Sequence, residues 1–223
     1  MVNRSTIRRE SRAARVRRAR QIARLLAEAY PNAYCELNFT SPFQLLIATV
    51  LSAQSTDKQV NALTPALFAR FPDARHMAEA DLRDLEEAVR SSGFYHNKAK
   101  AINGIGRALL ERFDGQVPAT MAELTSLPGV GRKSANVVLG NAFGVPGFPV
   151  DTHVTRVSNR LGLVDTTDPV AIESVLTDLF PDDMWTMTSH RFIFQGRYTC
   201  KARRPACAEC SITELCPSAY SFG

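Results

Sequence analysis

The stretch LTSLPGVGRKSAN, residues 124–136, places a short turn between two helical segments. Because Pro128 stops the first helix, and Gly129 and Gly131 permit positive φ and close backbone approach, the stretch predicts a helical hairpin. Free backbone N–H groups and the positive dipole end of the second helix would suit a phosphate oxygen. A plain turn whose glycines only satisfy geometry explains the same letters, so both interpretations stay open.

Lys133 lies in the first turn of the helix that follows this hairpin. A lysine at such a position is ordinarily a solvated charge, which the helix dipole slightly opposes. The dipole and partial burial would both favour the free amine, which is the form that acts as a nucleophile. Lys133 is therefore a candidate nucleophile as well as an ordinary surface charge.

Outward from the hairpin, helix signals recur along the chain, whereas the period-two alternation of strands is nearly absent. Capping boxes are expected at Ser41–Gln44 and Thr56–Gln59, and Asp168 precedes a proline in the same way. We therefore expect an all-α fold. Its helices are predicted at about 16–29, 43–51, 56–63, 81–90, 98–113, from 120, and at 133–143, 152–161, 169–180 and 189–198.

The composition is that of a soluble globular protein, with 223 residues, 45% hydrophobic and 22% charged. The length suits one large domain or two closely joined ones. No apolar run reaches the roughly 18 residues that span a bilayer, and the basic N-terminus is not followed by the apolar core of a secretory signal. We therefore expect no membrane partner and a cytoplasmic, nucleoid-associated location.

Positive charge is concentrated in the first 24 residues, which hold nine arginines and a single acid, Glu10. The whole chain has a formal net charge of +5, so the remainder is net acidic. Such a basic arm contacts phosphates, acidic partners or nothing in particular. Nucleic acid is therefore one open interpretation of this segment.

Four of the five cysteines, Cys200, Cys207, Cys210 and Cys216, fall within one short stretch, and Cys35 stands apart. In a reducing compartment, clustered thiols indicate a metal rather than disulfides. Zinc commonly uses two separated C-x2-C pairs, and only one such pair is present here. The spacing therefore favours one continuous wrap around an iron–sulfur cluster, with zinc as the alternative.

Asp151 directly precedes the helix expected at 152–161. The simplest role for an aspartate at a helix start is an N-cap. A carboxylate fixed by capping bonds can also stabilise positive charge that develops on a substrate or accept a proton, so the two roles can coexist.

Four strings together identify a resemblance: LSAQ from Leu51, LPGVGRKSANVVL from Leu127, VDTHVTRVSNR from Val150 and GRYTC from Gly196. In this order they resemble endonuclease III, a family of the helix-hairpin-helix DNA glycosylase superfamily, over about residues 45–217. The resemblance implies a two-domain fold. Its six-helix domain would span 35–146 and contain the hairpin, and its cluster domain would combine 1–34 with 147–223.

The resemblance also implies an activity, a cofactor and a partner. The protein would be a bifunctional DNA glycosylase and AP lyase that excises oxidised pyrimidines from damaged duplex DNA. Lys133 would attack C1′ and form a Schiff base, β-elimination would break the strand on the 3′ side, and Asp151 would be the second catalytic residue. The cysteines Cys200, Cys207, Cys210 and Cys216 would hold a [4Fe-4S] cluster, and the chain is expected to be monomeric.

Contacts with DNA follow from the same resemblance. They are expected at Gln54, Phe94, Gly129, Val130, Gly131, Lys201, Arg203 and Arg204. Gln54 would be a wedge that replaces the flipped base, and Phe94 stands where close relatives usually carry a leucine wedge. The plainer alternatives are an ordinary loop glutamine at position 54, core packing of Phe94, and a solvated loop at 201–204 that balances the charge of the cluster.

Other functions share some of these features. An adenine-mismatch glycosylase has the aspartate and the cluster but typically lacks the lysine and carries a further C-terminal domain. A non-catalytic DNA-binding module would keep the hairpin and the cluster without Lys133 and Asp151 together. A zinc-dependent binding protein is a third alternative.

Overall fold

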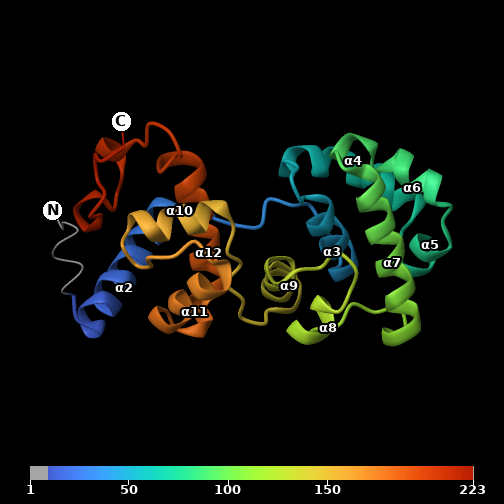
Figure 1. Ribbon diagram of the computed structural model, residues 1–223, viewed down its shortest axis with the longest axis horizontal. Coiled ribbons are helices and arrows are strands. Elements are labelled where there is room, and N and C mark those ends of the chain that lie inside the picture. Colours follow the sequence, from blue (N-terminus) through green and yellow to red (C-terminus); the bar gives the residue numbers. More distant parts are fainter. Residues whose placement is uncertain (1–9, 223) are drawn as a thin grey trace. The chain divides into compact units, whose positions relative to one another are not determined.

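A computed structural model of the protein describes residues 10–222, which are helical and contain no β-strand (Figure 1). The predicted all-α class is confirmed. The described chain divides into two compact units. The middle unit is Cys35–Val145, and the ends unit is built from both chain ends, up to Tyr34 and from Pro146 onward. The expected domains, 35–146 and 1–34 with 147–223, stay a prediction.

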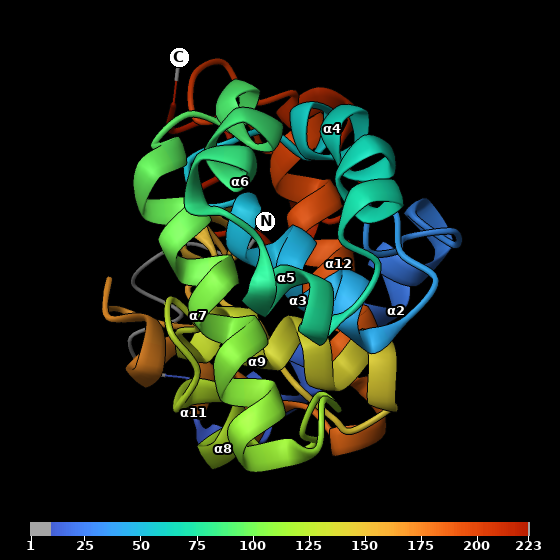
Figure 2. The same ribbon diagram turned by 90° about the vertical axis from the view of Figure 1, so that its right-hand side faces the viewer.

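The middle unit surrounds α3, Pro42–Leu51, whose side chains from Leu45 to Leu51 are all buried. This burial agrees with a helix that is apolar on nearly every side. Around it lie α4 (Asp57–Arg70), α5 (Ala74–Glu79), α6 (Leu82–Ala88), the 3-10 turn η1 (Arg90–Ser92), α7 (Tyr95–Phe113), α8 (Met121–Thr125) and α9 (Arg132–Val138). The longest of them, α7, packs against α5 and α6 (Figure 2).

The helix starts of the middle unit follow the predicted caps with one difference. The box at Thr56 and Gln59 is complete, as predicted. At Ser41 it is half formed, because the Gln44 side chain accepts from the Thr40 amide (2.9 Å) instead of the Ser41 amide. The Ser41 hydroxyl still accepts from the Gln44 amide, so the helix begins where expected.

Two helices of the middle unit differ from the prediction. The helix expected at 56–63 continues through Pro65 to Arg70, since the proline lies on the exposed face, where water can satisfy the carbonyl it leaves free. The helix α5 was not predicted, because its six residues are too short for a helical period to be recognised.

The ends unit contains α2 (Arg12–Ala29), α10 (Thr152–Arg160), α11 (Pro169–Leu179), the turn η3 (Asp182–Met184), α12 (Trp185–Phe194), the π-turn η4 (Gln195–Thr199), and the 3-10 turns η5 (Cys207–Glu209) and η6 (Thr213–Leu215). Its core includes Phe148, Phe180 and Phe192, with ring centroids 6.2–6.3 Å apart. Asp168 caps α11 as predicted. The helix expected from Ser189 begins four residues earlier, at Trp185.

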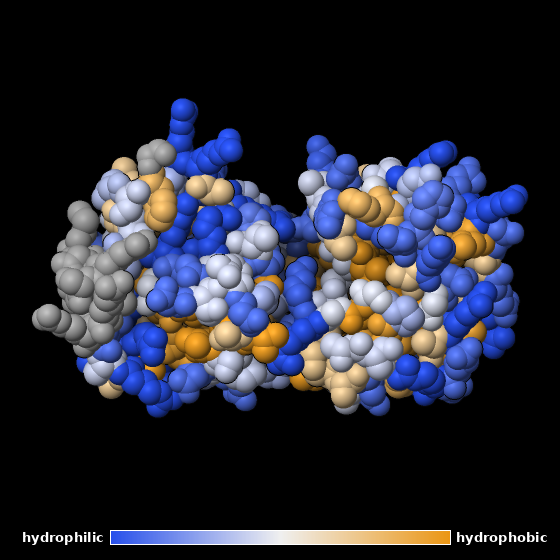
Figure 3. Space-filling model, viewed as in Figure 1, coloured by the Kyte–Doolittle hydropathy of each residue, from blue (hydrophilic) through white to orange (hydrophobic). Residues whose placement is uncertain are grey.

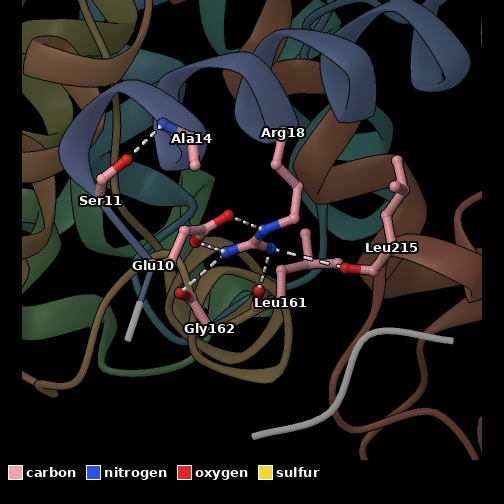
Figure 4. A network of polar contacts seen from close by, with 7 residues as sticks. All are labelled: Glu10, Ser11, Ala14, Arg18, Leu161, Gly162 and Leu215. Atoms are coloured by element: carbon pink, nitrogen blue, oxygen red, sulfur yellow. Dashed lines mark hydrogen bonds and ion pairs between the residues drawn. The ribbon is translucent and has the colours of Figure 1, made fainter. Parts of the chain in front are cut away.

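Arg18, one of the nine arginines of the basic arm, is buried in the ends unit. Its side chain is only 6% exposed and forms a 2.8 Å ion pair with Glu10. Its guanidinium also donates to the backbone oxygen of Leu161 at 2.7 Å (Figure 4). Residues 1–9 of the arm, with Arg4, Arg8 and Arg9, lie outside the described residues.

Hydrophilic residues cover most of the face drawn in Figure 3, and apolar side chains show between them on each unit. Within residues 10–222, no helix combines the length and the apolar character needed to cross a membrane.

Candidate functional site

The predicted hairpin is present between α8 and α9. Gly129 has a φ of 72°, and a Cβ at this position would meet the Ala101 Cβ at 3.1 Å, so this glycine serves both the turn and a close approach. Gly131 differs from the expectation, because its φ is −90° and it acts as the N-cap of α9. Only the first of the two glycines therefore uses a positive φ.

The backbone amides of the hairpin are not equivalent. The Val130 amide donates to Leu127 O at 3.2 Å, and the Val130 side chain is buried in the core of the middle unit. Among the described residues, no acceptor is recorded for the amides of Gly129 and Gly131. A phosphate oxygen would therefore find its donors on either side of Val130.

Lys133 is exposed in the first turn of α9. The expected partial burial of this amine is wrong, since its neighbours Gly131 and Arg132 are exposed as well. The exposed position leaves the amine accessible to a substrate.

Asp151 caps α10, as one of its two predicted roles requires. Its Oδ1 accepts hydrogen bonds from the amides of His153 and Val154, both at 2.8 Å. Oδ2 has no partner among the described residues. The carboxylate is thus held through one oxygen while the other can face a ligand.

The four clustered cysteines line one cavity of the ends unit, together with Gln195, Ile212 and neighbouring turn residues. Burial, with a contribution from the other three thiols, raises the pKa of Cys216 to about 11. Four crowded thiols, one of them with a raised pKa, fit a site whose positive metal stabilises the thiolates.

A zinc ion and an iron–sulfur cluster require different arrangements of the four thiols. A zinc ion would draw its ligands to about 2.3 Å from a single point. Within the described part of the chain, no trio of His, Cys, Asp or Glu side chains is placed around such a single-ion position. A multi-iron cluster instead binds its four thiolates at separate corners, which fits sulfurs spread around a cavity.

Two arginines that the sequence analysis did not single out hold the cysteine loop. Arg160 donates to Cys200 Sγ at 3.3 Å and to Lys201 O at 2.7 Å, and Arg156 donates to Cys200 O at 3.0 Å. The two arginines are four residues apart on α10, so they share one helix face. This spacing, visible in the VDTHVTRVSNR string, was the signal that could have identified them.

The cations Lys201, Arg203 and Arg204 are exposed on the loop between the first two cysteines. Arg160 fixes the backbone of this loop by donating hydrogen bonds to Lys201 O and Ala202 O. Their predicted contact with DNA stays a prediction.

Gln54 and Phe94 lie at two loop tips of the middle unit, and both have left-handed backbones, with φ of 56° and 50°. Phe94 is 65% exposed, so core packing of this side chain is wrong. Gln54 is exposed as well. Both side chains are accessible, as a wedge requires.

Comparison with known protein families gives two matches. The family described as HhH-GPD superfamily base excision DNA repair protein matches residues 47–182. The family described as the iron-sulfur binding domain of endonuclease III matches residues 200–216, from the first to the last clustered cysteine.

Individual relatives agree with these matches. Endonuclease III of Synechocystis sp. is 51% identical over 94% of this chain and 96% of its own length. A solved non-covalent endonuclease III–DNA complex superimposes with a TM-score of 0.89 at 43% identity, covering 92% of this chain and 97% of that chain. A trapped covalent endonuclease III–DNA intermediate gives the same TM-score at 44% identity and the same coverage.

Proposed function

Since this chain belongs to the endonuclease III family, it is a DNA glycosylase and lyase of base excision repair with a [4Fe-4S] cluster, and we propose that Lys133 and Asp151 perform its chemistry. The predicted family, cofactor and enzyme class are thereby confirmed. Cys200, Cys207, Cys210 and Cys216 would hold the cluster, which stabilises the loop that bears Lys201, Arg203 and Arg204.

Base removal needs a nucleophile and a group that stabilises positive charge on the sugar. The damaged nucleotide leaves the stack, and the free amine of Lys133 attacks its C1′ while the bond from C1′ to the base breaks. The base departs with the bonding electrons and takes up a proton. The carboxylate of Asp151 stabilises the positive charge that develops on the sugar and accepts the proton released by the amine.

Strand cleavage follows from the adduct with Lys133. Opening of the sugar ring leaves a protonated imine between Nζ and C1′, which acidifies the protons on C2′. Loss of one such proton, with breakage of the C3′–O3′ bond, releases the 3′ phosphate as the leaving group. Water then hydrolyses the imine and regenerates the lysine.

The observation that carries this proposal is the exposed amine of Lys133 directly after the hairpin, in a chain similar to an endonuclease III that was trapped covalently on DNA. Borohydride reduces an imine to a stable amine, so a duplex with an abasic site should form a covalent adduct with the wild-type protein. Lys133→Ala should abolish this adduct, and Lys100→Ala, which removes another exposed lysine of the middle unit, should retain it. Adduct formation by Lys133→Ala would exclude Lys133 as the nucleophile.

Asp151→Asn tests the second residue without removing the cap, since an amide oxygen also accepts from the His153 and Val154 amides. We expect base excision to fall by about 10²- to 10⁴-fold with an unchanged helical spectrum. Excision at the wild-type rate would reduce Asp151 to a structural cap.

The finer features of this activity are also proposals. The lesions are oxidised pyrimidines, the protein acts as a monomer, and it works in the cytoplasm close to the nucleoid. Excision from thymine-glycol duplexes, with little release of adenine from a mismatch, would separate this substrate class from that of an adenine-mismatch glycosylase. Sedimentation with and without DNA tests the oligomeric state.

A further inference from the structure

The two loop tips at Gln54 and Phe94 share a strained backbone. Residues other than glycine seldom adopt a left-handed conformation, and they keep it only where the surrounding structure fixes it. Gln54 follows α3, and Phe94 directly precedes α7. A contact that joins the two loops would help to hold both conformations in place.

Lys98 of α7 supplies that contact. Its Nζ lies 2.9 Å from Ser55 Oγ and 2.7 Å from Ser92 O. The Ser55 hydroxyl also donates to Ser92 O. Ser55 adjoins Gln54, and Ser92 lies two residues before Phe94, so one ammonium joins the two loops close to their tips.

The position of Lys98 is an unusual one for a lysine. The side chain is only 5% exposed, and burial lowers the pKa of Lys98. Its nitrogen has no acidic partner among the described residues, so its hydrogen bonds to Ser55 and Ser92 must offset the loss of water. Because these hydrogen bonds depend on direction and distance, they hold Ser55 and Ser92 in one geometry around the nitrogen.

We propose that Lys98 is a positioning residue that fixes the loops 52–56 and 89–94 relative to each other, so that Gln54 and Phe94 enter the duplex as one preorganised pair. This inference rests on the proposed function and on the expectation, taken from the family resemblance, that both side chains fill the space of an extruded nucleotide. A side chain held in place before binding loses less conformational freedom when it enters the stack. Lys98 thus acts on base flipping and not on the chemistry at C1′.

The test compares Lys98→Met with Lys100→Met, an exposed lysine on the same helix. Each variant is assayed on an abasic site within a paired duplex and on the same site within an unpaired bubble, where flipping is already complete. For Lys98→Met we expect a loss of up to about 100-fold on the paired site, the size of effect that a small misplacement produces. Its activity in the bubble, and both activities of Lys100→Met, should stay close to wild type.

A fluorescent base opposite the lesion reports the entry of the wedge directly. The wild-type protein should raise the emission of a 2-aminopurine placed there, and Lys98→Met should not. Ser55→Ala removes the hydroxyl that bonds both Lys98 and Ser92, so it should shift both readouts in the same direction by less. Ser55→Ala also serves as the test if Lys98→Met does not fold.

Two outcomes would overturn the inference. One is an equal loss on paired and bubble substrates, which would reduce Lys98 to a structural residue. The other is an unchanged 2-aminopurine signal in both Lys98→Met and Ser55→Ala. Borohydride trapping of the wild-type protein on the bubble substrate tests the proposed function separately, because it depends on Lys133 and not on the loops.

Discussion

The middle unit and the ends unit are both helical, but they bury different chemistry. Of the described residues in the middle unit, Lys98 is the single charged side chain that is buried, and the core of this unit is otherwise apolar. The ends unit buries Arg18, Arg160, Glu173 and His190, and its four thiols line a cavity. Apolar burial therefore stabilises both units, and the ends unit adds to its core the buried ion pair of Arg18 with Glu10 and a metal cluster.

Loss of the cluster should produce the largest difference in stability between the two units. A metal that binds only the folded chain adds its binding free energy to the stability of that chain. Cys210→Ser, which removes one ligand, should therefore lower the unfolding temperature of the ends unit by a large amount. Trp185, the single tryptophan, lies in that unit, and its fluorescence reports the transition. Helical signal from the middle unit should persist.

The matched control for this change is Cys35→Ser, which alters a cysteine of the middle unit. It should leave the iron content and the Trp185 transition unchanged. A Cys210→Ser protein that melts like the wild type, with its iron lost, would show that the ends unit does not need its cluster.

Removal of Arg18 should have the next largest effect. Arg18→Met would leave the Glu10 carboxylate, 11% exposed, without its ion pair, and breaking such a pair costs about 3–5 kcal/mol of unfolding free energy. Arg24→Met, which removes an exposed pair with Glu28 from the same helix, should cost about 0.5 kcal/mol or less. Urea unfolding followed by Trp185 measures both, and equal losses would contradict the distinction.

Acid should weaken the ends unit through His190. Burial lowers the pKa of His190 to about 4, while an unfolded histidine titrates near 6.5. Between these values the unfolded chain binds the proton and the folded chain does not, so stability falls as the pH is lowered from about 6.5 to about 4. The total is about 3 kcal/mol.

Urea unfolding at several pH values, followed by Trp185, checks this dependence. His190→Gln should flatten it, and His76→Gln, at an exposed site of the middle unit, should not. A slope that is the same in the wild type and in His190→Gln would assign the acid sensitivity to other groups.

The smallest of these effects concerns close packing in the middle unit. A Cβ at Gly106 would lie 2.7 Å from Ala74 O and 2.8 Å from Ala78 N, both backbone atoms of α5. We expect Gly106→Ala to destabilise by about 1–3 kcal/mol, measured by thermal melting of the helical signal. Gly104→Ala meets only the Pro128 side chain at 3.2 Å, and its better helix propensity should offset that contact.

Local signals predicted the elements that depend on neighbouring residues. The caps at Ser41, Thr56, Asp151 and Asp168 are all present, because a cap joins positions two or three residues apart. The short helix α5 has no such periodic signal. The backbone of α5 passes close to Gly106 of α7. A glycine within α7 was therefore an indirect indication that another backbone packs closely against this helix.

The candidate site was predictable to the same extent. Spacing alone indicated the four cysteines, whereas the catalytic roles of Lys133 and Asp151 followed from the resemblance of the sequences around them and stay predictions. The burial of Arg18 and Lys98 could not be predicted from the sequence, because the partners of both side chains lie far away along the chain. Leu161 is 143 residues from Arg18, and Ser55 is 43 residues from Lys98.

The use of both chain ends in one unit sets an order of assembly during synthesis. Translation produces α2 before the whole of the middle unit, so the apolar face of α2 must wait for α11 and α12, which follow that unit in the sequence. The middle unit can fold before these later helices are synthesised. Iron is therefore acquired after translation has passed the cysteine loop, and a chain that stops short of Cys200 leaves its first helix uncovered.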